Sequence, residues 1–336
     1  MLRRPGDAVT IWEVGKPMGH IESREDLPGA EEFFRSYVLA EGTPFEGVGK
    51  PVLLKGAARR MPAMKWSDEY LRKHHAKTPL DQVETEKKET RTRLPHESWT
   101  MAKFLDNYKE MDVYSVASTP KGLDKEVYLL PVMNCNGYQK KLVSNVFWMS
   151  NGKTKSVIHK DGHNNLHCMF DGEKQWALWR PDAKPGIATA KMGWIDGEKE
   201  AKKNPEKFKD AYGQYAGYID PEDVDVGRFP GWKKLEWWNM TLRRGDCAFI
   251  PPAWYHYVEA PAMRAVSVHL WFGAGKSWDG RVCEKLKQRG RNASEFVFRL
   301  GDCKFSEDGG PTKCRLPDKR LPQDLDSDSS SASVEL

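Results

Sequence analysis

Short apolar runs separated by Gly, Asn, Asp and Pro characterise the chain from about residue 143 to residue 272. Several of these runs alternate polar and apolar positions, as a strand does when only one of its faces is buried. We expect strands at residues 145–149, 156–159, 166–170, 175–179, 247–250 and 265–272. Many short strands of this kind predict an antiparallel sandwich or barrel.

The first half of the chain and the segment after residue 272 carry a different pattern. Apolar positions at helical spacing predict helices at residues 31–39 and 98–105, and Ser67 is placed to cap a helix that starts near Trp66. A short buried strand is expected at residues 51–54, and a helical segment at residues 276–300. Residues 1–30 are rich in Gly, Pro and charge, which predicts an irregular arm.

These patterns indicate one large domain at residues 31–300, mainly β with flanking helices. It divides into a helical and strand part at 31–142, a barrel core at 143–275 and a helical part at 276–300. A polar segment at residues 182–232 interrupts the strands, and we interpret it as an insertion. Residues 301–336 form a tail, which its Ser and Asp content predicts to be disordered from about residue 318.

Composition narrows the class of protein. Charged residues make up 30% of the 336 residues and hydrophobic residues 39%, which is the balance of a soluble globular chain. The 53 basic and 48 acidic residues are mixed along the chain, so no basic stripe for nucleic acid is evident. No apolar run is long enough to span a bilayer, so we expect no membrane span.

The candidate chemistry lies in three residues. His159 and Asp161 stand two positions apart at the end of an expected strand, so their side chains point to the same face. His256 follows a distant apolar strand that ends in Pro251-Pro252, and it can complete a set of two histidines and one carboxylate. Such a set on one face of Fe(II) leaves positions open for a co-substrate and dioxygen. We therefore predict an iron site made of these three residues.

A zinc site on a helix is the alternative, because His159, His163 and His167 are spaced by four. The Gly and Asn residues between them are poor helix formers, and the preceding Val157-Ile158 favours a strand. The segment also lacks the glutamate of a zinc protease motif. We therefore expect His163 in a loop and His167 inside the barrel.

Lys174 opens the expected strand at residues 175–179, after the turn Asp171-Gly172-Glu173. A lysine at the start of a strand is commonly solvated. A dicarboxylate co-substrate, however, would require a cation deep in the barrel, and a buried lysine requires an anionic partner. Lys174 is therefore a candidate ligand for such a co-substrate.

Together these motifs resemble the cupin-like JmjC family of Fe(II)- and 2-oxoglutarate-dependent oxygenases, and its small lysyl and asparaginyl hydroxylases in particular. The resemblance rests on residues 50–58, 156–179, 218–230 and 245–256, and it covers roughly residues 30 to 275. It implies a double-stranded β-helix, the jelly-roll barrel of the cupins, with iron held by the three residues above. The order of the motifs is more specific than any one of them.

The resemblance also implies roles in binding 2-oxoglutarate. Lys174 would pair with the distal carboxylate, and Ser156 stands where a hydrogen-bonding Thr is common. Asn165 matches an asparagine on the co-substrate side. His269 stands where an asparagine is common, so a ligand role and a core role both stay open for it. His167 replaces an aromatic residue, which makes the pocket more polar.

The reaction that follows from the resemblance consumes 2-oxoglutarate and O2 and hydroxylates a side chain of a protein or peptide substrate. Lysine demethylation of the JmjC type and a catalytically silent binding module are the alternatives. A sugar isomerase or another non-oxygenase cupin would use more histidines at the metal. By analogy with the family a homodimer is one option for the assembly, and the sequence does not decide it.

The compartment also has two interpretations. The basic N-terminus is not followed by an apolar stretch, which indicates no signal peptide and a cytoplasmic or nuclear protein. If the true N-terminus is missing, the lumen of the endoplasmic reticulum is favoured instead by the six cysteines, the sequons at Asn239 and Asn292 and the C-terminal Ser-Val-Glu-Leu. Six cysteines are ordinary for a chain of this length, so we interpret them as ordinary usage rather than as a disulfide framework.

Overall fold

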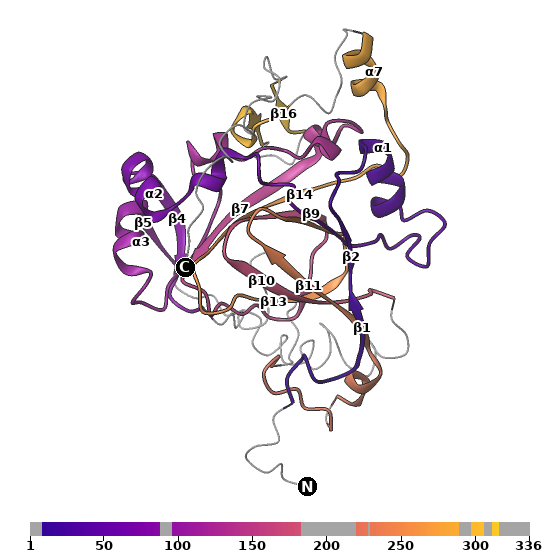
Figure 1. Cartoon of the computed structure of the whole chain (residues 1–336), viewed down its shortest axis with the longest axis horizontal. Coiled ribbons are helices and arrows are strands. Elements are labelled where there is room, and N and C mark those ends of the chain that lie inside the picture. The colour runs from indigo at the N-terminus through magenta and orange to yellow at the C-terminus, as the bar shows by residue number, and fades with distance from the viewer. Residues whose placement is uncertain are drawn as a thin grey trace, which may run out of the picture.

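Two β-sheets face each other and enclose the centre of the molecule (Figure 1). The computed structural model describes residues 9–87, 96–182, 220–227, 229–288, 297–305 and 311–315. The larger sheet has the order β2 (Glu22–Arg24), β3 (Val52–Leu54), β12 (Cys247–Ile250), β9 (Asn164–Asp171), β14 (Ala265–Phe272), β7 (Leu142–Ser150), β6 (Tyr114–Ala117), β4 (Pro79–Glu84) and β5 (His96–Thr100). The smaller sheet has the order β1 (Lys16–His20), β11 (Glu236–Arg243), β10 (Glu173–Trp179), β13 (Tyr255–Glu259) and β8 (His159–Lys160).

Alternation along the strands divides the side chains between two cores. On β9, Met169 packs with Trp176 and Leu178 of the opposite sheet, so odd-numbered residues of β9 point into the barrel. The intervening Leu166 and Phe170 pack on the other face of the larger sheet, among the helices. The mostly β architecture with flanking helices agrees with the predicted fold class, a jelly-roll barrel.

Every run that was expected to be a strand overlaps one, and the runs at residues 247–250 and 265–272 match β12 and β14 to the residue. The run at 156–159 is the weakest match, because only His159 of it belongs to β8. Strands β11 and β13 were not predicted. Both bury side chains on both faces, so neither shows a clear alternation: Trp237 and Tyr257 lie in one core, and Met240 lies in the other.

The prediction of an irregular arm at residues 1–30 is wrong for β1 and β2. Both run parallel to a barrel strand, β1 beside β11 and β2 beside β3. All five residues of β1 are exposed. Backbone pairing with β11 holds this strand in place. Its side chains therefore need not be apolar, and the sequence shows no hydrophobic pattern there.

The helices cover the larger sheet, with α2 and α3 beside β4 and β5 (Figure 1). Helix α1 (Ala30–Phe33) continues into a π-helical turn at Phe34–Val38. Helix α2 (Asp68–His75) is capped by Ser67, whose Oγ accepts a hydrogen bond from the Tyr70 N–H, as predicted. Short 3-10 helices lie at Pro62–Lys65, Leu123–Lys125, Pro131–Met133, Tyr138–Lys141, Pro230–Lys234 and Leu300–Asp302.

Helix α3 (Met101–Asn107) begins later than expected, because Thr100 caps it and residues 96–100 form β5. Helix α7 (Arg281–Gln288) occupies only part of the predicted helical segment at 276–300. Within that segment Arg299 instead forms a β-bridge with Tyr128, and residues 289–296 lie outside the described residues. None of the described helices combines the length and the apolar character needed to cross a membrane.

The insertion and the tail are described only in part. Of the predicted insertion at 182–232, residues 183–219 and 228 lie outside the described residues, while Val224, Phe229 and Trp232 pack on the outer face of the smaller sheet. In the tail, β15 (Cys303–Lys304) and β16 (Lys313–Cys314) pair as a hairpin. The predicted disorder from residue 318 lies outside the described residues.

The cysteines contradict our interpretation of them as ordinary usage. All six are paired, as Cys135–Cys283, Cys168–Cys247 and Cys303–Cys314. Two of the pairs join residues 148 and 79 positions apart. The fold brings these partners together over long separations, so their spacing in the sequence does not reveal the pairing.

Candidate metal centre

The three predicted metal ligands meet at one end of the smaller sheet. His159 on β8 is the register partner of His256 on β13, and their ring centroids are 4.2 Å apart. Asp161 follows β8, and its Oδ2 lies 3.8 Å from His256 Nε2. One ligand atom from each of the three residues lies within 4.8 Å of the other two, which is close enough for one metal ion to bind all three.

Backbone carbonyls orient both imidazoles. His159 Nδ1 lies 2.8 Å from the Val157 carbonyl oxygen, and His256 Nδ1 lies 3.0 Å from that of Trp254. A carbonyl only accepts, so each Nδ1 carries the proton and each Nε2 presents its lone pair. This second hydrogen bond is a usual property of histidines that bind metals.

The Asp161 carboxylate and backbone are also held. Trp271 on β14 donates its indole N–H to Asp161 Oδ2 over 3.1 Å. The backbone N–H of Ala253 donates to the Asp161 carbonyl over 2.7 Å. Ala253 has a φ of 63°, a left-handed conformation that is unfavourable for alanine and that turns the chain between β12 and β13.

The donor set fits Fe(II). Two imidazole nitrogens and one carboxylate oxygen are the ligands of non-haem iron oxygenases. His256 is buried, whereas His159 and Asp161 are partly exposed, so the centre has one accessible side. The alternative of a helical histidine site is excluded, because His167 lies on strand β9 and His163 is exposed.

Lys174 lies inside the barrel. Its relative exposure is 4%, and burial lowers the pKa of its ammonium group to about 7. Its Nζ lies 5.0 Å above the Trp148 ring, and no carboxylate among the described residues forms an ion pair with it. The preceding turn requires Gly172, because φ is +69° and a Cβ there would lie 2.1 Å from the Arg264 carbonyl oxygen.

Ring contacts that include two buried histidines link Lys174 to His256. His167 and His269 are register partners on β9 and β14, with ring centroids 5.4 Å apart. His269 also contacts Trp148, and His167 contacts Trp176, which in turn contacts His256. Burial, and then the charge of Lys174, holds the pKa of both histidines well below the usual range, so both are neutral.

Several polar atoms of this interior are unsatisfied. Asn165 Oδ1, both ring nitrogens of His167, His269 Nε2 and Ser267 Oγ are buried without a hydrogen-bond partner among the described residues. Native interiors contain few such atoms. These atoms line the same barrel interior as Lys174 and are available to a polar ligand.

Ser156 and the aromatic residues complete the comparison with the sequence. The Ser156 hydroxyl accepts a hydrogen bond from the Val258 N–H on β13, over 2.9 Å. Sequence reasoning missed Trp148, Trp176 and Trp271 as site residues. Each of the three lies on a strand between residues that point away from the barrel. This alternation is the signal that could have placed their side chains inside the barrel.

The comparisons with known proteins agree with this geometry. A model of the cupin-like domain matches residues 39–277. Lysine-specific demethylase JMJ31 of Arabidopsis thaliana is 31% identical over 139 residues, 40% of this chain and 21% of that protein. The human bifunctional peptidase and (3S)-lysyl hydroxylase JMJD7 is 25% identical over 130 residues, 38% of this chain and 40% of that protein. Human HSPB1-associated protein 1 is 25% identical over 140 residues, 41% of this chain and 25% of that protein. The chain therefore spans less than half the length of these relatives.

Proposed function

Because the chain belongs to the cupin-like domain family, we propose that it is an Fe(II)- and 2-oxoglutarate-dependent oxygenase that hydroxylates a side chain of a protein substrate. The observation that carries the proposal is the pairing of two features in one barrel. One is the cluster of His159, Asp161 and His256. The other is Lys174, buried without a carboxylate partner among the described residues. A bound metal alone would explain only the cluster of three ligands. A dicarboxylate co-substrate that binds the metal and pairs with Lys174 would explain both features.

The residues divide the work as follows. His159, Asp161 and His256 would hold Fe(II), with both Nε2 atoms directed by the backbone carbonyls. The bound iron supplies the redox chemistry that converts 2-oxoglutarate, O2 and a C–H bond into succinate, CO2 and an alcohol. Three ligands from the protein leave positions for the co-substrate and O2.

Lys174 and its neighbours would hold the co-substrate. The Lys174 ammonium group pairs with the distal carboxylate and thereby gains the anionic partner that a buried cation requires. The neutral rings of His167 and His269 each carry one N–H, and the Asn165 side chain has an amide NH2, so these three residues can donate hydrogen bonds to oxygens of the co-substrate. The Ser156 hydroxyl can donate to the co-substrate, because its oxygen is held by the hydrogen bond that it accepts from the Val258 N–H.

Lysine demethylation is a second candidate, favoured by the 31% identity to a protein named as a lysine-specific demethylase. Both reactions oxidise a C–H bond and differ in the carbon that is presented. Oxidation of an N-methyl group releases formaldehyde, whereas oxidation of another side-chain carbon leaves one added oxygen on the substrate. A catalytically silent binding module is a third candidate, and the complete set of three metal ligands argues against it.

Succinate release tests the proposal. The full chain loaded with Fe(II) is incubated with 2-oxoglutarate, O2 and a protein extract, and succinate and the masses of extract peptides are measured. We expect succinate formation that is lost in His159→Ala and retained in His163→Ala, an exposed histidine of the same segment outside the metal cluster. Added oxygen on a peptide supports hydroxylation, and loss of a methyl group supports demethylation. Binding of 2-oxoglutarate without succinate release would overturn the proposal in favour of the silent module.

A further inference from the structure

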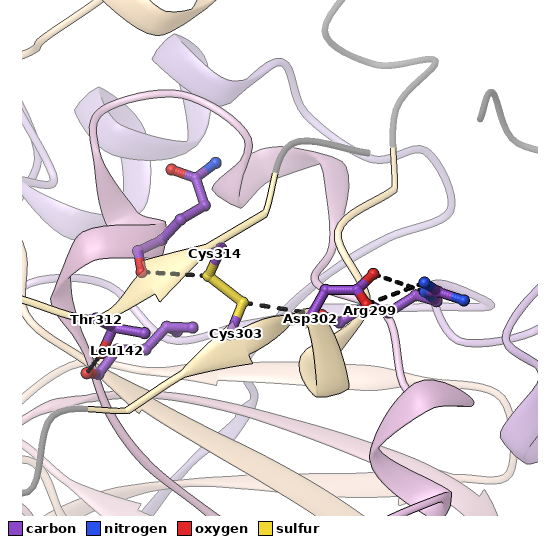
Figure 2. Close-up of a disulfide and its surroundings, with 7 residues drawn as sticks. Leu142, Arg299, Asp302, Cys303, Thr312 and Cys314 are labelled. Carbon is purple, nitrogen blue, oxygen red and sulfur yellow. Dashed lines mark hydrogen bonds and ion pairs between the residues drawn. A yellow bond between two sulfur atoms is a disulfide. The ribbon is translucent and has the colours of Figure 1, made fainter. Parts of the chain in front are cut away.

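The hairpin in the tail contains a disulfide that bridges its two strands. Cys303 and Cys314 are register partners, and their Cα atoms are 3.9 Å apart (Figure 2). The Thr312 hydroxyl donates to the Leu142 carbonyl over 2.7 Å, which fixes the hairpin to the start of β7. Contacts that do not involve sulfur therefore hold the two cysteines in bonding position.

A second pair lies in the barrel wall. Cys168 on β9 and Cys247 on β12 are directly opposite each other, with Cα atoms 4.0 Å apart, and both are buried. The strand pairing continues on one side of them from His167 with Ala248 to Asn165 with Ile250. The register of the sheet thus brings these two sulfur atoms together.

The third pair attaches α7 to the body of the domain. Cys135 and Cys283 have Cα atoms 5.5 Å apart. Nearby, the Asn136 N–H donates to the Asp279 carbonyl over 3.0 Å, and the Asp279 N–H donates to Asn136 Oδ1 over 2.7 Å. As in the other two pairs, independent hydrogen bonds align the segments that carry the cysteines.

From these three pairs we infer that the protein folds and acts in an oxidising compartment, and that its substrate is a protein that passes through the same compartment. The clause on the substrate rests on the proposed function. No cysteine is left unpaired, and all three pairs have Cα separations within or just below the usual range for disulfides. Disulfides persist in the secretory pathway and in other oxidising compartments, whereas the cytosol keeps thiols reduced.

The sequons do not carry this inference. Asn239 lies on β11 between β1 and β10, and its Oδ1 is buried, so glycosylation would have to precede folding. Asn292 lies outside the described residues.

Each bridge forms when two thiols lose two protons and two electrons to a disulfide-carrying oxidant, whose own disulfide becomes two thiols.

Thiol mapping of the protein from its native cells tests the inference. Cells are lysed in the presence of a thiol-blocking reagent, and the full chain is purified and digested without reduction. We expect three linked peptides, Cys135–Cys283, Cys168–Cys247 and Cys303–Cys314, and label on the six cysteines only after reduction. Six blocked thiols in the unreduced protein would overturn the inference.

Fractionation of the same cells provides a second measurement that needs neither iron nor 2-oxoglutarate. We expect the chain in a membrane-enclosed fraction, where added protease degrades it only after detergent treatment. Degradation without detergent contradicts the inference even if the enzyme is active. Conversely, the protein could contain the three linked pairs and yet release no succinate. That result would support the oxidising compartment and overturn the proposed function. The substrate clause is tested by treating lumenal and cytosolic extracts separately, with added oxygen expected only on lumenal proteins.

Discussion

The indole N–H of Trp271 donates a hydrogen bond to Asp161 Oδ2 over 3.1 Å, and this bond joins the two sheets of the barrel. Trp271 lies on β14 of the larger sheet, whereas Asp161 follows β8 of the smaller one. The Asp161 carboxylate, a proposed metal ligand, is therefore oriented by a contact from the opposite sheet.

Removal of this hydrogen bond should weaken metal binding. We expect Trp271→Phe to lower the affinity for Fe(II) by roughly 10- to 100-fold, the usual effect of removing a partner of a metal ligand. Titration with Co(II), followed by its absorption, measures the affinity in the absence of turnover. Trp238→Phe is the control, because Trp238 is a partly buried residue whose ring contacts are with Phe45 and Trp254, neither of them a proposed metal ligand. Equal affinities in both variants would show that the bond does not orient Asp161.

Binding of 2-oxoglutarate should weaken as pH rises above 7. The pKa of Lys174 is lowered to about 7, so the free protein loses this charge above that pH, and binding the dianion must then restore a proton. We expect the Kd to be on the order of tenfold higher at pH 8.5 than at pH 6.5. Calorimetry with the Mn(II)-loaded protein measures this without turnover.

Lys174→Arg separates this effect from other titrations. Arginine keeps its charge throughout this range, so its Kd should not depend on pH in the same way. The neighbouring His167 and His269 are neutral throughout, because their pKa values are lowered well below the usual range. A slope that persists in Lys174→Arg would assign the pH dependence to another group.

The same lysine should lower the stability of the protein when no co-substrate is added. Unfolding restores the ordinary Lys174 pKa of 10.5, so below pH 7 the folded state carries the full cost of a buried charge, and this cost falls as pH rises from 7 towards 10.5. We expect Lys174→Met to raise the free energy of unfolding at pH 6.5 by about 1–4 kcal/mol, as replacement of buried charges often does. Urea unfolding of the metal-free protein measures this. A destabilised Lys174→Met protein that still bound 2-oxoglutarate would contradict the role assigned to Lys174.

The two buried histidines should contribute to binding of the co-substrate and not to binding of the metal. A hydrogen bond to a charged group contributes about 1.5–3 kcal/mol, so His269→Ala and His167→Phe should each raise the Kd for 2-oxoglutarate roughly tenfold or more. His269→Asn should restore most of the affinity, because the amide also donates. Affinity for Co(II) is the internal control. If the Kd of His269→Ala and the Kd of His167→Phe both lay within about twofold of the unsubstituted protein's value, His167 and His269 would only fill the core.

The sequence predicted a strand where polar and apolar residues alternate. Along β14, Ser267 and His269 alternate with Val266, Val268 and Leu270, which pack among the helices, and the bounds of this strand were predicted to the residue. Strand β1 could not be predicted, since all five of its residues are exposed and only backbone hydrogen bonds place it.

The candidate site divides in the same way. The short spacing of His159 and Asp161 on a strand indicated a shared face, and the structure brings His256 beside them. The contact of His167 with His269 depends on the register between β9 and β14. Register of this kind is determined by the whole sheet, so no local pattern showed that the two rings would meet.

The order of the cysteines along the chain has a consequence for biosynthesis. The bridge between Cys135 and Cys283 encloses the one between Cys168 and Cys247, so Cys135 and Cys168, the first two of these six cysteines in chain order, are not partners. A nascent chain that is oxidised as it emerges would join Cys135 to Cys168. Only thiol–disulfide exchange can correct that error, and it takes seconds to hours, depending on the oxidant and on whether an isomerase is present. The rate at which this protein matures should therefore depend on the isomerase activity around it more than on the speed at which its sheets assemble.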